Sequence, residues 1–86
     1  MKLNKDFLLH NIGDETVLVP TGKAEFSGIV RGNKTLGAVM ELLKTDTTET
    51  AIVDAMCEQF DAPRNVIEQD VRRVLDELQK IGALDA

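Results

Sequence analysis

The residues with the strongest intrinsic reactivity in this chain are one histidine, His10, and one cysteine, Cys57. A nucleophilic enzyme needs a nucleophile, a base and a third group that orients the base. His10 falls in a predicted strand and Cys57 in a predicted helix, and nothing in their spacing brings them together. Cys57 follows Val53 by four residues on an apolar stripe, which is typical of a buried structural thiol. We therefore expect no catalytic residues and no enzyme activity.

Metal and cofactor motifs are also missing from the sequence. One histidine and one cysteine are too few for the four ligands of a structural zinc site, and the carboxylates lack a paired metal-binding spacing. Gly28, Gly32 and Gly37 are four and five residues apart, which matches neither the dinucleotide fingerprint nor the phosphate-binding loop. The sequence therefore predicts no metal and no cofactor.

The charge balance bears on the class of partner. The chain has 10 Lys and Arg against 15 Asp and Glu, a net charge of −5, so it repels phosphate backbones and anionic headgroups. We expect neither a nucleic-acid partner nor a membrane partner.

Cysteine content and the N-terminal segment bear on location. A single cysteine excludes an internal disulfide and fits a reducing cytosol. Only three apolar residues, Phe7 to Leu9, follow the polar start, too few for a signal-peptide core or a membrane span. We expect a complete, cytoplasmic chain that forms one domain over residues 1–86.

Short apolar runs mark the first third of the chain. They cover residues 7–12, 17–19 and 24–30, and they stop at Gly13-Asp14, Pro20-Thr21-Gly22 and Arg31-Gly32-Asn33. This pattern predicts three short strands, with Pro20 and Gly22 suited to a hairpin between the second and the third. Gly28 weakens the third strand or permits a bulge.

From Asn33 onward the apolar spacing becomes helical. The three predicted helices bury Leu36, Val39, Met40 and Leu43; Ile52, Val53, Met56 and Phe60; and Ile67, Val71, Val74, Leu78 and Ile81. Asn33 is a good N-cap for the first helix, and residues 46–49 offer a capping box for the second, with Thr47 or Thr48 as equally suitable caps. The third helix is expected to begin at Pro63 and end at Gly82.

Three strands followed by three helices predict an α+β fold whose three-stranded antiparallel sheet is too small to close and keeps an open edge. An open edge beside an amphipathic helix can capture an extended peptide as an added strand. The alternative is a winged-helix regulator that presents Arg64, Arg72 and Arg73 to DNA or binds another protein. DNA is the weaker option, because the same helix carries four acidic residues: Glu68, Asp70, Asp76 and Glu77.

The order and spacing of these segments resemble the PqqD family, small proteins and domains also called RiPP recognition elements. The resemblance runs from about Phe7 to Leu84. It is carried by residues 26–30, 33–35, 39–43, 48–53, 70–71 with Leu75 and Leu78, and 82–84. The chain departs from the family at Val39-Met40, where an aromatic residue is common, and at Gly28 in the third strand.

The resemblance implies a winged-helix-like fold and a function in making ribosomally synthesised, modified peptides or pyrroloquinoline quinone (PQQ). Such proteins bind the leader of a precursor peptide as a strand added to their third strand, in a groove closed by the third helix. They deliver it to a modifying enzyme, often a radical S-adenosylmethionine protein. The implied contacts here are Glu25, Phe26, Ser27, Gly28, Ile29 and Val30 on the strand, and Ile67, Asp70, Arg73, Val74 and Glu77 on the helix.

Some of these helix residues also have a purely structural interpretation. Ile67 and Val74 lie on an apolar stripe that is explained by core packing alone. Asp70 is spaced to pair with Arg73 on a solvated face. With these alternatives open, the sequence predicts a non-catalytic peptide-binding protein.

Overall fold

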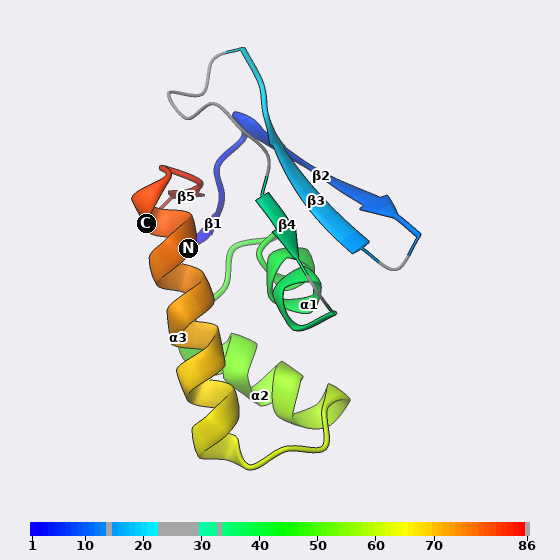
Figure 1. Cartoon of the computed structure of the whole chain (residues 1–86). Coiled ribbons are helices and arrows are strands. Elements are labelled where there is room, and N and C mark those ends of the chain that lie inside the picture. Colours follow the sequence, from blue (N-terminus) through cyan, green and yellow to red (C-terminus); the bar gives the residue numbers. More distant parts are fainter. Residues whose placement is uncertain (14, 23–29, 33, 86) are drawn as a thin grey trace.

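The structure is a computed structural model of the 86-residue chain, and it describes residues 1–13, 15–22, 30–32 and 34–85. The elements follow in the order β1 (Lys2–Leu3), β2 (Phe7–Ile12), β3 (Glu15–Pro20), β4 (Val30–Gly32), α1 (Lys34–Leu42), α2 (Glu49–Gln59), α3 (Arg64–Lys80) and β5 (Leu84–Asp85) (Figure 1). The predicted α+β fold, a three-stranded antiparallel sheet followed by three helices, is confirmed.

The sheet has the order β2-β3-β4, with all neighbours antiparallel. Leu9 pairs with Leu18 at the centre of the β2–β3 hairpin, and Gly13 takes a positive φ of 61° next to the turn. Because side chains alternate along a strand, Phe7 and Leu18 point into the core while Leu8 and Ile12 remain 51% and 64% exposed. One face of the sheet therefore lies on the core, while the other carries exposed apolar residues along β2 but is buried at Val17 of β3, which is 4% exposed.

The third strand of the sheet differs from its prediction. Arg31 and Gly32, which were expected in a turn, pair with Val17 and Thr16 as part of β4. Gly32 suits this position because a Cβ there would collide with the Leu36 side chain. The remainder of the predicted strand (24–29), most of the predicted hairpin connection after Gly22, and the Asn33 cap lie outside the described residues.

The helices agree closely with their apolar spacing. Thr48 is the N-cap of α2, where its Oγ1 accepts a hydrogen bond from the Ala51 N–H at 3.1 Å. Pro63 precedes the first turn of α3, and Gly82, with a φ of 74°, follows its last turn. The buried core is made of Phe7, Leu18, Val39, Met40, Leu43, Ile52, Val53, Met56, Ile67, Val71, Val74, Leu75, Leu78 and Ala83.

A second, two-stranded sheet joins the ends of the described chain. Lys2 pairs with Asp85 and Leu3 with Leu84, and the Leu3 N–H donates to the Leu43 carbonyl at 2.8 Å. This pairing was not predicted, because two-residue strands carry no periodic signal.

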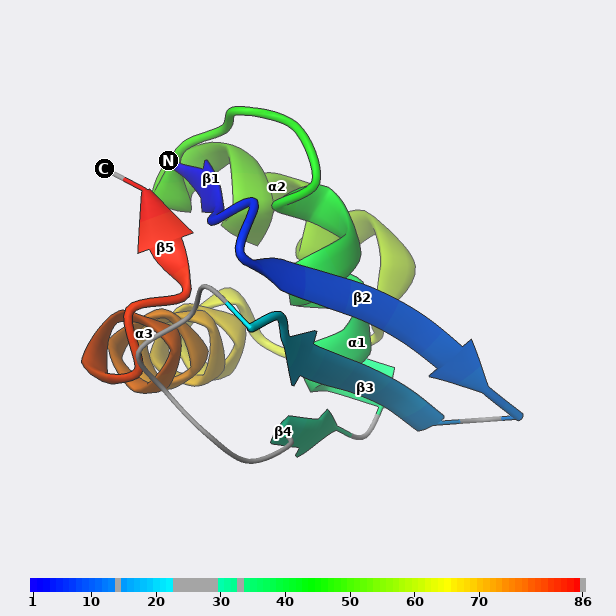
Figure 2. The same ribbon diagram turned by 90° about the horizontal axis from the view of Figure 1, so that it is seen from above.

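The helices pack against one face of the sheet and beside one of its edges. Figures 1 and 2 show α1 beneath the sheet, α2 further from it, and α3 on the side of the molecule to which β4 belongs. Of the three strands in the sheet, β4 is the one nearest α3 in the view of Figure 1. In the part of the chain that the structure describes, no helix combines the length and apolar character needed to cross a bilayer.

Candidate peptide-binding site

The feature most suited to binding a polypeptide is the outer edge of β4. Among the strands that the structure describes, β4 has a neighbour only on its β3 side. Its other edge faces the side of the molecule where α3 lies (Figure 2). An edge of this kind presents N–H and C=O groups to an added strand. Of the six residues predicted to pair with a peptide, 25–29 lie outside the described residues, and Val30 begins β4.

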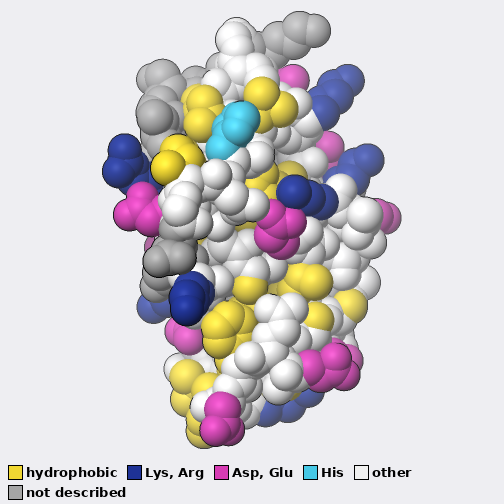
Figure 3. All heavy atoms as spheres, turned by 90° about the vertical axis from the view of Figure 1, so that its right-hand side faces the viewer, with side chains coloured by type: hydrophobic (Ala, Val, Ile, Leu, Met, Phe, Trp, Pro, Cys, Tyr) yellow, Lys and Arg dark blue, Asp and Glu magenta, His cyan; other side chains and the backbone are white. Residues whose placement is uncertain are grey.

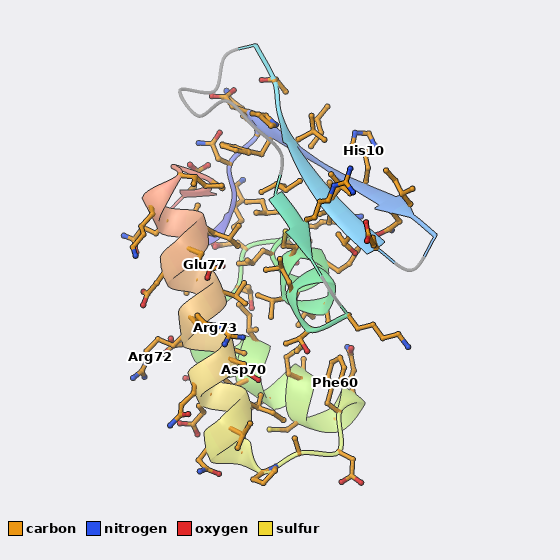
Figure 4. All side chains as sticks on the ribbon, viewed as in Figure 1. His10, Phe60, Asp70, Arg72, Arg73 and Glu77 are labelled. Carbon is orange, nitrogen blue, oxygen red and sulfur yellow. The ribbon has the colours of Figure 1, made fainter. Side chains whose placement is uncertain are left out.

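The helical residues predicted to line the groove divide into two groups. Ile67 and Val74 are 4% and 3% exposed and belong to the core. Asp70, Arg73 and Glu77 are spaced three and four residues apart, and Figure 4 shows them following one another along α3. The structure therefore brings the three polar residues to one solvent-facing strip of the helix, while the two apolar residues lie beneath it.

Asp70 and Arg73 form the predicted ion pair, with 3.4 Å between Asp70 Oδ1 and an Arg73 guanidinium nitrogen. The Arg73 side chain is nevertheless 66% exposed, so most of its donors face solvent. Arg72 projects from the other side of α3 in Figure 4 and lies 3.6 Å from Glu49. Two adjacent arginines thus have different surroundings, and Arg73 is the one next to the predicted peptide face.

A small pocket adjoins the N-terminal half of α3. It has a volume of about 100 Å³ and is lined by Thr35, Met56, Phe60, Ala62, Ile67 and Asp70. Sequence reasoning assigned Phe60 only to the core face of the second helix, whereas the half-buried ring also borders this pocket. No sequence signal marks this role, because the pocket forms from three separate helices.

A shallow hollow of about 560 Å³ runs along α3. It is lined by Asn65, Glu68, Gln69, Arg72, Arg73, Asp76, Glu77 and Lys80, which include three basic and three acidic residues. The predicted site contained only Arg73 and Glu77 of this set. The others follow the polar stripe of the helix, and that stripe was the signal available to find them.

The arginines that a DNA-binding interpretation would use are all engaged with carboxylates. Arg64 lies 2.7 Å from Asp54 and 3.2 Å from Glu68, and the hydrogen bond to Asp54 raises the pKa of the Arg64 guanidinium above its ordinary value. With Arg72 and Arg73 paired as described above, α3 presents balanced charges. A phosphate backbone requires an excess of positive charge, which this helix lacks.

The reactive residues identified in the sequence do not form a site together. His10 is exposed on β2, whereas Cys57 is a half-buried free thiol on α2 that packs against the core. Across residues 1–13, 15–22, 30–32 and 34–85, no group of three or more His, Cys, Asp or Glu side chains is placed to hold a metal ion.

In the residues that the structure describes, a small α+β domain leaves β4 as an edge strand, an arrangement of the kind that domains binding extended polypeptides by strand addition use. The comparison with protein families gives a more specific assignment. The chain belongs to the PqqD family, described as coenzyme PQQ synthesis protein D, whose model matches residues 15–84. The family resemblance inferred from the sequence is thereby confirmed. No curated protein matches the chain.

Two solved structures share the fold over nearly the whole chain. TbiB1 in complex with the TbiA(beta) leader peptide is 24% identical with a TM-score of 0.85, covering 100% of this chain and 96% of that one. Lasso peptide synthetase B1 complexed with the leader peptide is 13% identical with a TM-score of 0.77, covering 95% of this chain and 93% of that one. At these identities the likeness establishes a common fold.

Proposed function

We propose that this protein binds the leader segment of a ribosomally made precursor peptide and presents it to a separate modifying enzyme. The observation that carries the proposal is the open edge of β4 on the α3 side of a PqqD-family domain. Support comes from the two similarly folded structures, both of which are complexes with leader peptides.

In this proposal the leader forms main-chain hydrogen bonds with β4 and with the segment that precedes it, Glu25 to Ile29. Each main-chain hydrogen bond contributes about 0.5–1.5 kcal/mol net, so several are needed for useful affinity. Because these bonds use the backbone, they are tolerant of the leader's sequence. Selectivity must then come from side chains along α3.

The side-chain contacts are assigned to the exposed strip of α3. Arg73 offers guanidinium donors for a leader carboxylate or carbonyl, while Asp70 and Glu77 accept from leader donors. Ile67 acts at the wall of the small pocket, where it gives an apolar leader side chain a surface to contact. Val74 supports the helix from the core instead of touching the leader directly.

The modifying chemistry is assigned to the partner enzyme, a radical S-adenosylmethionine protein or another peptide-modifying enzyme. This chain is given no catalytic role, because its reactive residues are separated on β2 and α2. The pathway is either PQQ formation or the maturation of another ribosomal peptide.

The test is an NMR titration of the isotope-labelled protein with the leader portion of a short peptide encoded beside its gene. We expect the amide shifts to concentrate in Arg31, Gly32 and the segment before them, and along residues 67–77. A scrambled leader of the same composition is the control. Shifts that are absent with every neighbouring leader, but present with duplex DNA, would overturn the proposal in favour of a winged-helix regulator.

A further inference from the structure

Among the strands that the structure describes, β2 also has a neighbour on one side only, so the sheet has a second open edge on the side away from β4. Its six residues, Phe7–Ile12, contain no Lys, Arg, Asp, Glu or Pro, which are the residues that proteins use to protect exposed edges. Leu8 and Ile12 on this strand are among the most exposed large hydrophobic residues that the structure describes, at 51% and 64%. They lie on either side of His10 in the sequence, and Figure 3 shows apolar side chains around the cyan imidazole. The β2 edge therefore has apolar side chains beside it and none of the charged or proline residues that discourage strand addition.

Beside the first half of β2 lies a hollow of about 360 Å³ with a basic lining. Lys2, Lys5 and Lys44 line it together with Leu8, Leu9 and the carboxylate of Asp85. Figure 3 shows dark blue side chains to the right of the cyan imidazole and others to its left. In a chain of net charge −5, three lysines against one carboxylate make this hollow a local exception.

The nearby carboxylates neutralise only part of the positive charge of these lysines. Glu41 pairs with Lys44 at 3.0 Å, Asp46 with the Met1 ammonium at 2.7 Å, and Asp85 accepts a hydrogen bond from Asn4 at 2.8 Å. Among the described residues, neither Lys2 nor Lys5 forms an ion pair. An incoming acidic group would therefore meet available cations.

We propose that the β2 edge is a second strand-addition site, which takes an extended segment of a partner protein with alternating apolar and acidic residues. In a strand added to β2, successive side chains point to opposite faces of the sheet. Those on the outer face lie beside Leu8 and Ile12, so apolar residues are favoured there. Those on the inner face beside the first half of β2 point toward the hollow and Lys44, so Asp or Glu is favoured there. Further along, Glu41 accepts a hydrogen bond from Asn11 at 3.4 Å, so the preference for acidic residues is confined to the first half of the strand.

The charge pattern also selects the occupant. A second copy of this chain would bring β2 against β2, and this strand has no acidic residue to face Lys2, Lys5 or Lys44. A segment of a separate protein with alternating apolar and acidic residues can pair its carboxylates with the lysines and pack its apolar side chains against Leu8 and Ile12. Because the β2 edge and the β4 edge are on opposite sides of the sheet, the two sites share no strand-pairing groups.

The experiment uses a capped synthetic peptide, Val-Glu-Val-Glu-Val-Glu, titrated into the isotope-labelled protein at low salt, with Val-Lys-Val-Lys-Val-Lys as its charge-reversed counterpart. We expect the acidic peptide to shift the amides of residues 7–12 and to bind at least about tenfold more tightly than the basic one. The double variant Lys2→Glu/Lys44→Glu should weaken binding about tenfold. Lys34→Glu, the same charge change at the start of α1, should change it less than twofold.

Leu8→Thr tests the apolar part, since it keeps a strand-forming residue at a half-exposed position. Threefold or greater weakening is expected, with amide shifts of the free protein changed only near residue 8 and its cross-strand partner Val19. Equal binding of the two peptides, shifts outside β2, or self-association through β2 in analytical ultracentrifugation would overturn the proposal. Since leader binding is read at β4 and α3, failure at β2 leaves the proposed function standing, and the reverse also holds.

Discussion

Thr16 and Gly37 illustrate how single residues fix the sheet on α1. Thr16 is only 9% exposed, and its hydroxyl donates to Asn11 Oδ1 at 3.2 Å. A Cβ on Gly37 would collide with the Thr16 hydroxyl and lie 3.0 Å from its Cβ. The absence of a side chain at Gly37 therefore lets the helix approach β3 closely.

Gly37→Ala should destabilise the protein by about 1–2 kcal/mol. The overpacking cost of about 1–3 kcal/mol exceeds the helix-propensity gain of up to about 1 kcal/mol. Urea unfolding measures the change. Gly22→Ala is the matched control, because a Cβ there meets nothing within 4 Å. The double variant Thr16→Ala/Gly37→Ala should recover part of the loss, and a Gly37→Ala protein as stable as the wild type would contradict this packing argument.

Arg73 and Arg72 provide a matched pair for leader binding. Arg73→Ala should weaken leader affinity about three- to tenfold, because it removes exposed donors from the predicted peptide face. Arg72→Ala removes the same charge from the other side of α3 and should change affinity less than twofold. Isothermal titration calorimetry with the leader measures both values. Equal effects of the two substitutions would show that α3 contributes through net charge only.

At the scale of elements, the helices and the bounds of β2 agree with the sequence pattern, whereas the bounds of β3 and the end of β4 do not. Helical spacing identified buried positions such as Val39, Ile52 and Val71, because a helix shows its core face every three or four residues. The sequence pattern ends the third strand at Val30, whereas β4 continues through Arg31 and Gly32, because this pairing depends on contacts with β3 and Leu36. Tertiary contacts of this kind leave no local pattern.

The candidate site was accessible to sequence reasoning only in part. The spacing of Asp70, Arg73 and Glu77 predicts that they share one polar face of α3, and the family resemblance implies that this face contacts the leader. The pocket bordered by Thr35 and Phe60 was not visible, because it exists only once α1, α2 and α3 have packed together.

The cap of α2 carries a prediction at this scale. Thr48→Ala should lower the free energy of unfolding by about 0.5–2 kcal/mol, because the Ala51 N–H loses its side-chain acceptor. Thr50→Ala, an exposed change inside the same helix, should be neutral or slightly stabilising. Thermal unfolding compares the two. Thr48→Asp should restore most of the loss, and its failure to do so would argue that Thr48 acts through packing.

For the whole molecule, the acidic surface sets the response to pH. The hydrogen bond from Lys44 holds the pKa of Glu41 below its usual 4.5, and the hydrogen bond from the Met1 ammonium holds the pKa of Asp46 below its usual 3.8. A carboxyl whose folded-state pKa is depressed stabilises the fold above its unfolded pKa. This stability is lost as the pH falls through the folded value.

Stability should therefore change little from these two groups above about pH 5 and should fall as the solution is acidified below the unfolded pKa values. Glu41→Gln should make the decline between pH 5 and pH 3 shallower, as followed by urea unfolding at a series of pH values. Glu58→Gln, an exposed change on α2, serves as the control and should keep the wild-type decline. An unchanged pH profile for Glu41→Gln would contradict the role assigned to the Lys44 pair.

The pairing of β1 with β5 has a mechanical consequence. Because Lys2 lies opposite Asp85 in an antiparallel pair, tension applied to the two chain ends would peel the strands apart one residue pair at a time. Hydrogen bonds loaded in sequence yield at lower force than hydrogen bonds sheared together. Under traction the molecule should thus open first where its ends meet, and the antiparallel β2–β3–β4 sheet would bear load only after that seam had parted.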